Sequence, residues 1–152
     1  MIIPDVNLLI YAYDSDSPYH AKAAEWWQKC LSESEPIGLP SVVIFAFMRI
    51  TTHARVFQKP ITPAKAADHI RSWLAQPCAQ VLEPGANHVH HVLKLIEEIG
   101  TAANLVTDAQ IAALAIEYDA VLHTADSDFL RFPGVQWFNP LTGVARKTLG
   151  KL

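Results

Sequence analysis

Short apolar runs alternate along this chain with longer segments of helical periodicity, and this alternation limits the fold more than any other feature. Strands that alternate with helices predict a parallel sheet covered by helices on both faces. We therefore expect an α/β fold, a three-layer α/β/α sandwich with a mostly parallel central sheet of four to five strands. The expected strands are Met1–Pro4, Pro36–Leu39, Ala79–Leu82, Ala120–His123 and, as the fifth, Val135–Phe138.

Capping signals predict where several of the intervening helices begin and end. Ser17-Pro18 and Thr62-Pro63 each place a hydroxyl before a first-turn proline, which predicts helices that run to about Leu31 and Leu74. The first helix would bury a stripe at helical spacing, made of Tyr19, Ala23, Trp26, Trp27 and Cys30. We interpret its tryptophans as core residues and not as a surface for stacking bases.

The other helices are predicted from apolar content and end signals. Asn7–Tyr13 is expected to be short, and Val42–Ile50 is apolar on nearly every side and therefore expected in the interior. Gly100 should end a helix that begins near His88. Thr107–Gln110 has the pattern of a capping box, which predicts a helix from there to Glu117.

Length and composition predict one domain over residues 1–152. A chain of 152 residues can bury a substantial core, and 51% of them are hydrophobic. No run approaches the ~18 apolar residues of a membrane span. The start lacks the basic region of a secretory signal, so we expect a cytoplasmic location. Cys30 and Cys78 have no metal-ligand spacing, and we interpret them as reduced core thiols.

The net charge of −3 is not typical of a nucleic-acid-binding protein, but the distribution of charge is uneven. The segment 49–67 contains Arg49, Arg55, Lys59 and Lys65 and no acid. The segment 129–152 contains Arg131, Arg146, Lys147 and Lys151, again with no acid. These segments could contact a phosphodiester substrate, although a pair of solvated faces explains them equally well.

Four aspartates follow the predicted strands or open a helix near the same sheet edge. Asp5 follows the first strand, Asp108 opens the last long helix, and Asp126 and Asp128 follow the fourth strand. Ligands of open α/β sheets bind beyond the carboxyl ends of the strands, so these acids should converge. Oxygen-only clusters of this kind suit Mg²⁺ or Mn²⁺. Individually, helix capping, the helix dipole and a turn would explain them.

Other catalytic signatures are weak or absent. His88 and His91 would share one helix face while His90 points away, and no cysteine accompanies them, so a zinc site is not expected. His123 is interpreted as a satisfied core or rim residue. The chain has no nucleophile elbow, phosphate-binding glycine loop or dinucleotide fingerprint.

Three segments together resemble the PIN-domain family, and within it the ribonuclease toxins of the VapC type. They are the opening Pro-Asp5-Val-Asn7-Leu-Leu-Ile-Tyr11, the helix start Thr-Asp108-Ala-Gln, and the closing Leu-His-Thr124-Ala-Asp126-Ser-Asp128-Phe. The resemblance spans nearly the whole chain. It implies a PIN-like sandwich and RNA cleavage that depends on Mg²⁺ or Mn²⁺. It also implies a cognate antitoxin as partner and a homodimer.

The resemblance also assigns roles to individual residues. Asp5, Asp108 and Asp126 would be the catalytic metal ligands, with Asp128 as an auxiliary acid; Asn7 and Thr124 would be polar supports, and Arg49 could hold a flanking phosphate. The family usually has a glutamate on the helix after the second strand, where this chain has Ala46. Because of this departure, the number of metal ions that the site would hold, one or two, stays open. The departure also leaves two alternatives, a non-catalytic scaffold that binds a partner and a metal-dependent phosphatase.

Overall fold

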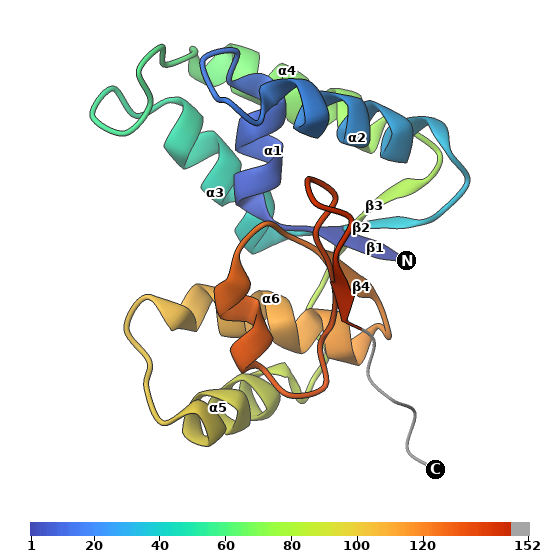
Figure 1. Ribbon diagram of the computed structural model, residues 1–152, viewed down its shortest axis with the longest axis vertical. Coiled ribbons are helices and arrows are strands. Elements are labelled where there is room, and N and C mark those ends of the chain that lie inside the picture. The colour runs from blue at the N-terminus through green and yellow to red at the C-terminus, as the bar shows by residue number, and fades with distance from the viewer. Residues whose placement is uncertain (147–152) are drawn as a thin grey trace.

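The computed structural model describes residues 1–146, and its centre is a six-stranded sheet in the order β3-β2-β1-β4-β5-β6 (Figure 1). All pairs are parallel except β5 with β6. The α/β class and the mostly parallel sheet are confirmed, but six strands replace the expected four to five. The strands are β1 Ile2–Pro4, β2 Ile37–Pro40, β3 Ala79–Leu82, β4 Val121–His123, β5 Gln136–Phe138 and β6 Ala145–Arg146. β6, which was missed, is too short to show a pattern in the sequence.

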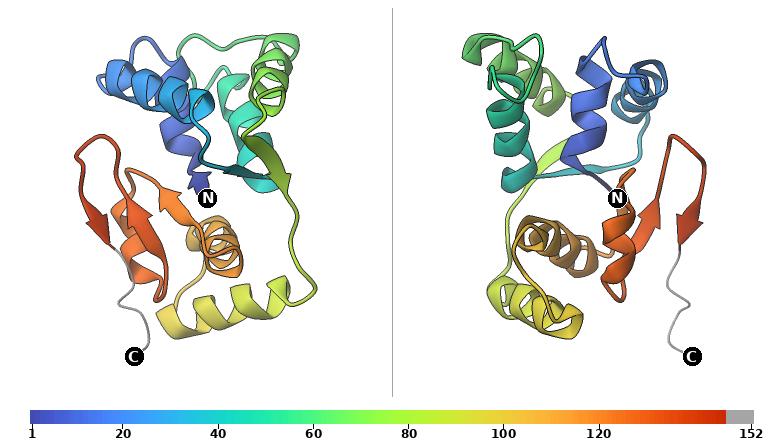
Figure 2. Two further views of the ribbon diagram at one scale, coloured as in Figure 1. Left: turned by 90° about the vertical axis from the view of Figure 1, so that its right-hand side faces the viewer. Right: turned by 60° about the vertical axis from the view of Figure 1, so that its left-hand side comes forward.

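Helices lie on both sides of this sheet. In Figure 1, α1 to α4 lie above the strands and α5 and α6 lie below them, and the turned views of Figure 2 show α5 and α6 side by side. Within the described chain, no helix is long and apolar enough to cross a membrane. The helices are α1 Val6–Tyr13, α2 His20–Ser32, α3 Ser41–Thr51, α4 Pro63–Leu74, α5 His88–Ile99 and α6 Leu105–Glu117, followed by the short 3-10 helix η1 Ser127–Arg131.

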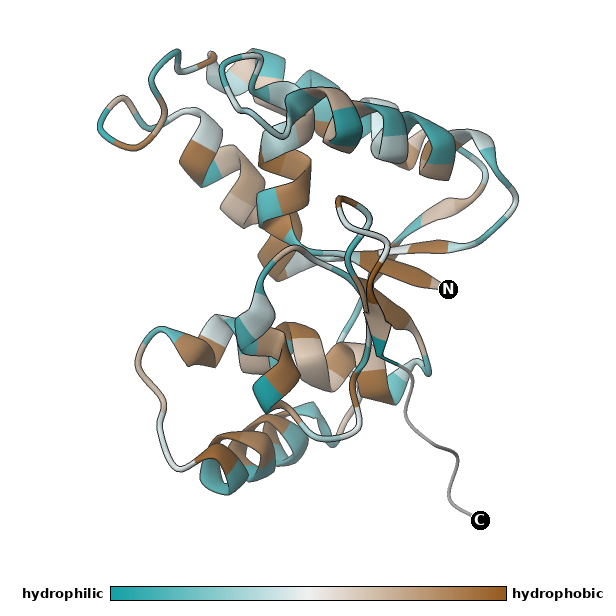
Figure 3. Ribbon diagram, viewed as in Figure 1, coloured by the Kyte–Doolittle hydropathy of each residue, from teal (hydrophilic) through white to brown (hydrophobic). Residues whose placement is uncertain are grey.

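The core forms where the strands meet the inner faces of the helices. The central strands are hydrophobic while the outer face of α2 is largely hydrophilic (Figure 3). Trp27 and Phe47 both pack edge-on against Trp73, with ring centroids 5.5 and 4.8 Å from it. The prediction that the tryptophans of α2 belong to the core is therefore confirmed. Such aromatic contacts add to the free energy gained from burial.

The start of α2 differs from the prediction. The helix begins at His20, and Ser17 instead closes a turn in which its Oγ accepts a hydrogen bond from the amide of Tyr19, 3.1 Å away. Ala23 and Cys30 are buried as expected, but Tyr19 lies before the helix and is 48% exposed. A serine hydroxyl can accept a hydrogen bond from the amide two residues ahead as readily as it can cap a helix, and at Ser17 this local turn forms instead of the cap.

The start of α6 also differs. The helix begins at Leu105, so Thr107 and Asp108 lie inside its first turn and do not form a capping box. Leu105 is buried, and this packing fixes the helix start one turn earlier than the polar pattern suggests. By contrast, Thr62 caps α4 by accepting a hydrogen bond from the amide of Lys65, and Gly100 ends α5 with a φ of 78°, both as predicted.

The helix α3 is less buried than its composition suggests. Val43, Ile44 and Phe47 point into the core, whereas Phe45 is 67% exposed. A helix has one face toward the sheet and another toward solvent even when nearly all its residues are apolar. The expectation of an entirely interior helix was therefore wrong.

The order of the strands creates one crevice at the sheet centre. From β1 the chain continues outward through β2 and β3, while β4 lies on the other side of β1 and leads to β5. β1 and β4 are paired in parallel from Ile2 with Val121 to Pro4 with His123. Loops leaving two such neighbours in opposite directions open a crevice at their carboxyl ends, where α/β proteins bind ligands.

Candidate functional site

Asp5 and Thr124 stand at this central crevice because each is the first residue after one of the two paired strands. Asp5 follows Pro4, the last residue of β1, and its amide still donates to the carbonyl of His123 at 2.9 Å. Thr124 follows His123, and its amide donates to the carbonyl of Phe138 at 3.0 Å. The sheet ladder thus fixes both backbones where their side chains leave the strands.

The Thr124 hydroxyl connects the two acidic segments. It donates to Oδ2 of Asp5 at 2.8 Å and accepts the amide of Asp126 at 2.9 Å, and Thr124 is fully buried. Oδ1 of Asp126 in turn accepts the amide of Asp128 at 2.8 Å. One hydroxyl therefore orients a carboxylate from the start of the chain relative to the loop that carries Asp126.

Asp5 occupies the N-cap position of α1 but does not cap it with its side chain. No capping hydrogen bond forms, and only 2% of the residue is exposed. Burial raises the pKa of Asp5 to about 6, an effect that the Thr124 hydrogen bond partly offsets and the nearby Asp126 carboxylate reinforces. The backbone amides of Val6 and Asn7 also lower the pKa of Asp5, but burial outweighs all these hydrogen bonds, so a nearby cation would stabilise the carboxylate.

Asp108 reaches the same crevice from the first turn of α6. Its pKa is raised to about 7, first by burial and then by the negative charges of Asp5, Asp126 and Asp128. Four aspartates from three distant segments therefore act on one another electrostatically. Asp108 and Asp126 are partly buried and Asp128 is exposed at the rim.

The chemistry of this cluster suits a hard divalent cation. Carboxylate oxygens are the ligands of Mg²⁺ and Mn²⁺, and a cation would offset both the burial and the repulsion that raise the pKa values of Asp5 and Asp108. In residues 1–146, no three His, Cys, Asp or Glu side chains lie close enough together to hold a metal ion between them. Mg²⁺ keeps several of its waters and commonly binds only one or two carboxylates directly, so the remaining acids would act through those waters.

The remaining residues singled out from the sequence lie at different distances from this cluster. Asn7 is partly buried on the first turn of α1, two residues after Asp5. Arg49 is exposed near the end of α3, and no ion pair joins it to a carboxylate of the described chain. Ala46 is partly buried one turn earlier on the same helix and brings no charge.

Tyr11 is a neighbour of the acids that the sequence analysis did not single out as a site residue. The pKa of its phenol is raised, first by burial and then by the neighbouring Tyr19 and the charges of Asp5 and Asp126. Tyr11 lies four residues after Asn7, so the two share one face of α1. That spacing was the available signal in the sequence.

The histidines of α5 have a structural partner. Nδ1 of His88 and Nδ1 of His91 lie 3.0 and 2.8 Å from the same oxygen of Glu117, at the end of α6. This arrangement confirms that His88 and His91 share a face. His90 lies on the exposed side of the helix. These contacts of His88 and His91 with Glu117 join α5 to α6, and they involve none of the four aspartates.

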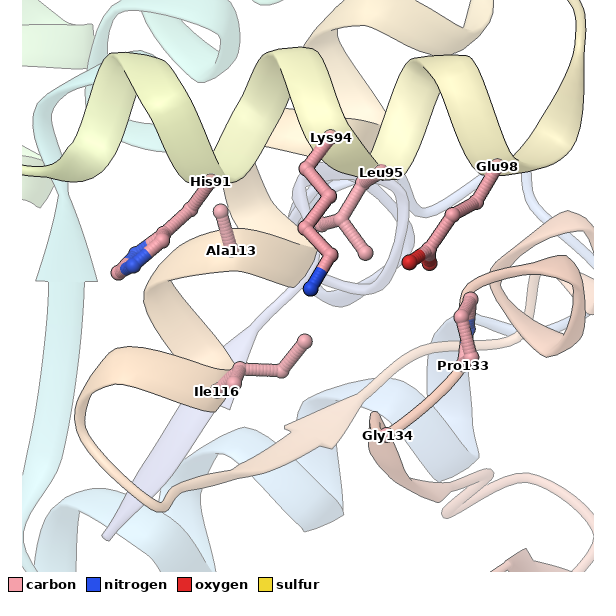
Figure 4. Close-up of a pocket in the computed structure, with 8 residues that line it drawn as sticks. All are labelled: His91, Lys94, Leu95, Glu98, Ala113, Ile116, Pro133 and Gly134. Atoms are coloured by element: carbon pink, nitrogen blue, oxygen red, sulfur yellow. The ribbon is translucent and has the colours of Figure 1, made fainter.

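A cavity of about 590 Å³ lies between α5, α6 and the segment before β5 (Figure 4). Lys94 and Glu98 point into it from α5, above apolar walls formed by Leu95 and Ile116. Its lining includes none of the aspartates, so the cavity is separate from the acidic cluster. Its size would suit a small molecule, but size alone assigns no ligand.

Comparison with known proteins places the chain among PIN domains. The family model described as PIN domain matches residues 2–135. The chain is 45% identical over 141 residues to Ribonuclease VapC33 of Mycobacterium tuberculosis, covering 93% of this chain and 99% of the relative. It is 37% identical over 140 residues to Ribonuclease VapC37 of the same organism, covering 92% and 97%.

Solved structures share the fold at lower identity. VapBC2 from Rickettsia felis, bound to a DNA fragment from its promoter, matches with a TM-score of 0.65 and 19% identity over 91% of this chain and 98% of that chain. VapC20 of Mycobacterium tuberculosis, a Sarcin-Ricin loop cleaving toxin, matches with a TM-score of 0.65 and 14% identity over 86% and 93%. With the family model covering most of its length and relatives this similar, the chain belongs to the PIN domain family.

Proposed function

We propose that this protein is a metal-dependent endoribonuclease, the toxin component of a type II toxin–antitoxin system. The observation that carries the proposal is the convergence of Asp5, Asp108 and Asp126 on the crevice between β1 and β4, where burial and then the neighbouring carboxylates raise the pKa values of Asp5 and Asp108. The names of the ribonuclease relatives support RNA as the substrate. Mg²⁺ or Mn²⁺ is the proposed ion, from the oxygen chemistry of the site.

Each acidic residue has a distinct part in the proposed site. Asp5, Asp108 and Asp126 hold the metal, directly or through its waters, and Asp128 adds negative charge at the rim. When bound, the ion polarises a phosphate oxygen and lowers the pKa of an attacking water. Thr124 positions Asp5 and the Asp126 backbone through its two hydrogen bonds. Burial of Asp5 keeps its carboxylate in one orientation and excludes competing water from it.

Two further residues are proposed to act around this centre. Asn7, one turn into α1, offers an amide that can hold a metal-bound water or a phosphate oxygen. Arg49, exposed on α3, is proposed to contact a flanking phosphate of the RNA. Neither role places the residue among the metal ligands.

The direct test is cleavage of RNA by the purified protein. Total RNA incubated with the protein and Mg²⁺ or Mn²⁺ should yield discrete cut ends, and EDTA should abolish them. Asp126→Asn should lose the cleavage while folding normally, whereas Asp68→Asn should keep it, because Asp68 is exposed on α4 and pairs only with Arg71. Equal cutting by the Asp126→Asn and unsubstituted proteins would refute the assignment.

Partners and location follow from the same proposal. Solved neighbours include toxin–antitoxin complexes, among them the VapBC2 complex, and we extend an antitoxin partner to this chain. A homodimer is also proposed, since exposed apolar side chains such as Phe45 are available for contact. A toxin that acts on cellular RNA would work in the cytoplasm.

One observation favours a second candidate function. Ala46 contributes no carboxylate from α3, so the site has fewer acids than the family pattern. The second candidate is a PIN-like scaffold that binds RNA or a partner without cutting. Calorimetric titration separates the two: saturable binding of Mn²⁺ supports the enzyme, and no binding up to millimolar metal supports the scaffold.

A further inference from the structure

We propose that Tyr11 and Tyr19 form a stacking platform for a nucleobase of the RNA, next to the phosphate held at the acidic cluster. This inference rests on the proposed ribonuclease function and adds the residues that position the substrate. Single-stranded RNA is recognised largely by stacking its unpaired bases on aromatic side chains. The two tyrosines are the aromatic pair that this chain places beside its carboxylates.

The two rings pack directly against each other. Their centroids are 5.1 Å apart and their planes are inclined at 48°. Tyr11 is partly buried on α1, while Tyr19 keeps 48% of its surface exposed. Tyr11 therefore supports Tyr19 from one side, and Tyr19 presents an open aromatic surface to solvent.

The backbone around the pair is held by local hydrogen bonds. Nδ1 of His20 lies 3.0 Å from the carbonyl oxygen of Tyr11, which ties the start of α2 to α1. The Ser17 hydroxyl accepts the Tyr19 amide, and the Tyr19 carbonyl accepts the amide of Ala23 at 3.0 Å. An aromatic side chain on a fixed backbone loses little conformational entropy when a ligand binds.

The pair lies beside the acidic cluster. The charges of Asp5 and Asp126 reach the Tyr11 phenol and contribute to raising its pKa. Asp5 is the N-cap of α1, Asn7 lies in the first turn of this helix, and Tyr11 lies one turn further along on the same face as Asn7. A nucleotide with its phosphate at the carboxylates would therefore have its base within reach of the two rings.

Tyr19 lies outside the core because α2 begins only at His20, while Trp26 and Trp27 of the predicted stripe are buried. Tyrosine combines an apolar ring with a polar hydroxyl, and side chains of this kind are enriched at interfaces. Stacking tolerates any base, so the platform positions the RNA without dictating its sequence.

Binding without cleavage tests the platform. The full protein, with Ca²⁺ in place of Mg²⁺ or Mn²⁺ as the oxygen-bound ion, is titrated into a short single-stranded RNA that carries 2-aminopurine, and both anisotropy and quenching of the fluorescent base are recorded. Stacking on one aromatic residue corresponds to about a 5- to 150-fold change in Kd on truncation. We expect Tyr19→Leu to weaken binding within this range and to reduce the quenching. Tyr19→Phe should retain both signals.

Tyr118→Leu is the matched control. Tyr118 is 41% exposed at the far end of α6 from Asp108, where its hydroxyl donates to the carbonyl of Glu83. This variant should bind and quench like the unsubstituted protein, and urea melts of all variants confirm that they fold. Equal binding and quenching by Tyr19→Leu overturns the platform alone. If the unsubstituted protein neither binds nor cuts RNA, the proposed function fails, and the platform fails with it.

Discussion

Thr124 shows how one buried hydroxyl can organise a site whose acids come from distant parts of the chain. It donates to Asp5 and accepts from the amide of Asp126, so both its proton and a lone pair are used. Since the residue is fully buried, water cannot replace either bond. The orientation of Asp5 relative to the loop after β4 therefore depends on this single side chain.

Thr124→Val should separate this positioning role from simple packing. Valine has nearly the same shape but leaves the Asp126 amide and Asp5 without their partner, which should cost about 1–3 kcal/mol of unfolding free energy. Loss of a residue that orients a metal ligand typically lowers metal affinity or activity about 10- to 100-fold. Thr124→Ser keeps the hydroxyl and should keep most activity. Urea denaturation and RNA cleavage of both variants measure the two effects; full activity in Thr124→Val would contradict the positioning role.

Asp5 should make the metal-free protein less stable as the pH rises. Its folded pKa of about 6 lies above the usual value of 3.8, so the folded state binds the proton more tightly than the unfolded state does. The resulting contribution to stability is fully present below about pH 4 and is lost as the pH rises through about 6, and for Asp5 it amounts to about 3 kcal/mol. Asp108, whose pKa is raised to about 7, extends this loss of folding stability toward neutral pH.

Asp5→Asn provides the measurement for this effect. In EDTA, the unfolding free energy of the variant should fall less between pH 4 and 7 than that of the unsubstituted protein. At pH 7 the variant should be at least as stable, because asparagine carries no charge to bury. Asp68→Asn should follow the unsubstituted protein across the range. A steeper fall in Asp5→Asn would show that the folded state binds the Asp5 proton more weakly than the unfolded state does.

The sequence predicts the position of the acids at the strand ends, but it does not predict the exposure of Tyr19. An acid directly after an apolar strand, as at Asp5 and Asp126, can be recognised from local spacing, and the strand order brings these two segments together; their catalytic role stays a prediction. Tyr19 was placed in a core stripe since its spacing from Ala23 suits a helix. Only the three-dimensional turn at Ser17, which starts α2 at His20, shows that Tyr19 faces solvent.

At the scale of elements, the contact of β2 with β3 depends on a glycine. Gly38 lies in the buried strand β2, and a Cβ atom there would come within 2.7 Å of Leu82 Cγ and 3.0 Å of Met1 Sδ. Leu82 is itself only 2% exposed, so it has little room to move aside. The glycine is required here by close packing between strands and the N-terminus.

Gly38→Ala should therefore be destabilising by about 1–3 kcal/mol, the usual cost of overpacking a core. Gly85→Ala is the control, because a Cβ atom at Gly85 meets nothing within 4 Å and its unfolding free energy should change by less than about 0.5 kcal/mol. Urea denaturation of the two variants gives the comparison. Equal stability of both would mean that Leu82 repacks freely.

The element boundaries show where sequence patterns stop being reliable. Gly100 was predicted correctly because a left-handed glycine ends a helix with few alternatives. The same hydroxyl-plus-proline signal caps a helix at Thr62 but forms a turn at Ser17, so that signal alone does not decide the boundary. The start of α6 was predicted one turn late, since the burial of Leu105 outweighs the polar pattern at Thr107. Capping residues predict a boundary only where tertiary packing does not compete with them.

For the molecule as a whole, the acidic cluster links the two ends of the fold. Asp5 belongs to the first strand–helix junction, and Asp108 and Asp126 come from the last third of the chain, on the other side of the central strand pair. In the metal-free protein, the mutual repulsion of these carboxylates is unfavourable. An ion shared between them would instead hold α1, α6 and the loop after β4 together.

Metal should therefore stabilise the whole protein, and more strongly at higher pH. An ion that binds only the folded state adds about 2.7 kcal/mol at 100 times its Kd. Because protons must leave carboxylates whose pKa values are about 6 and about 7, the gain should be larger at pH 8 than at pH 5.5. Thermal unfolding with Mn²⁺ or Mg²⁺, compared with NaCl of equal ionic strength, measures this stabilisation by metal.

The variants show where the ion binds. Asp5→Asn and Asp126→Asn should lose most of the metal-induced increase in Tm, and Asp68→Asn should keep it. An increase in Tm that is the same in all three variants would place the ion elsewhere on the protein, because only binding at the crevice depends on these particular carboxylates.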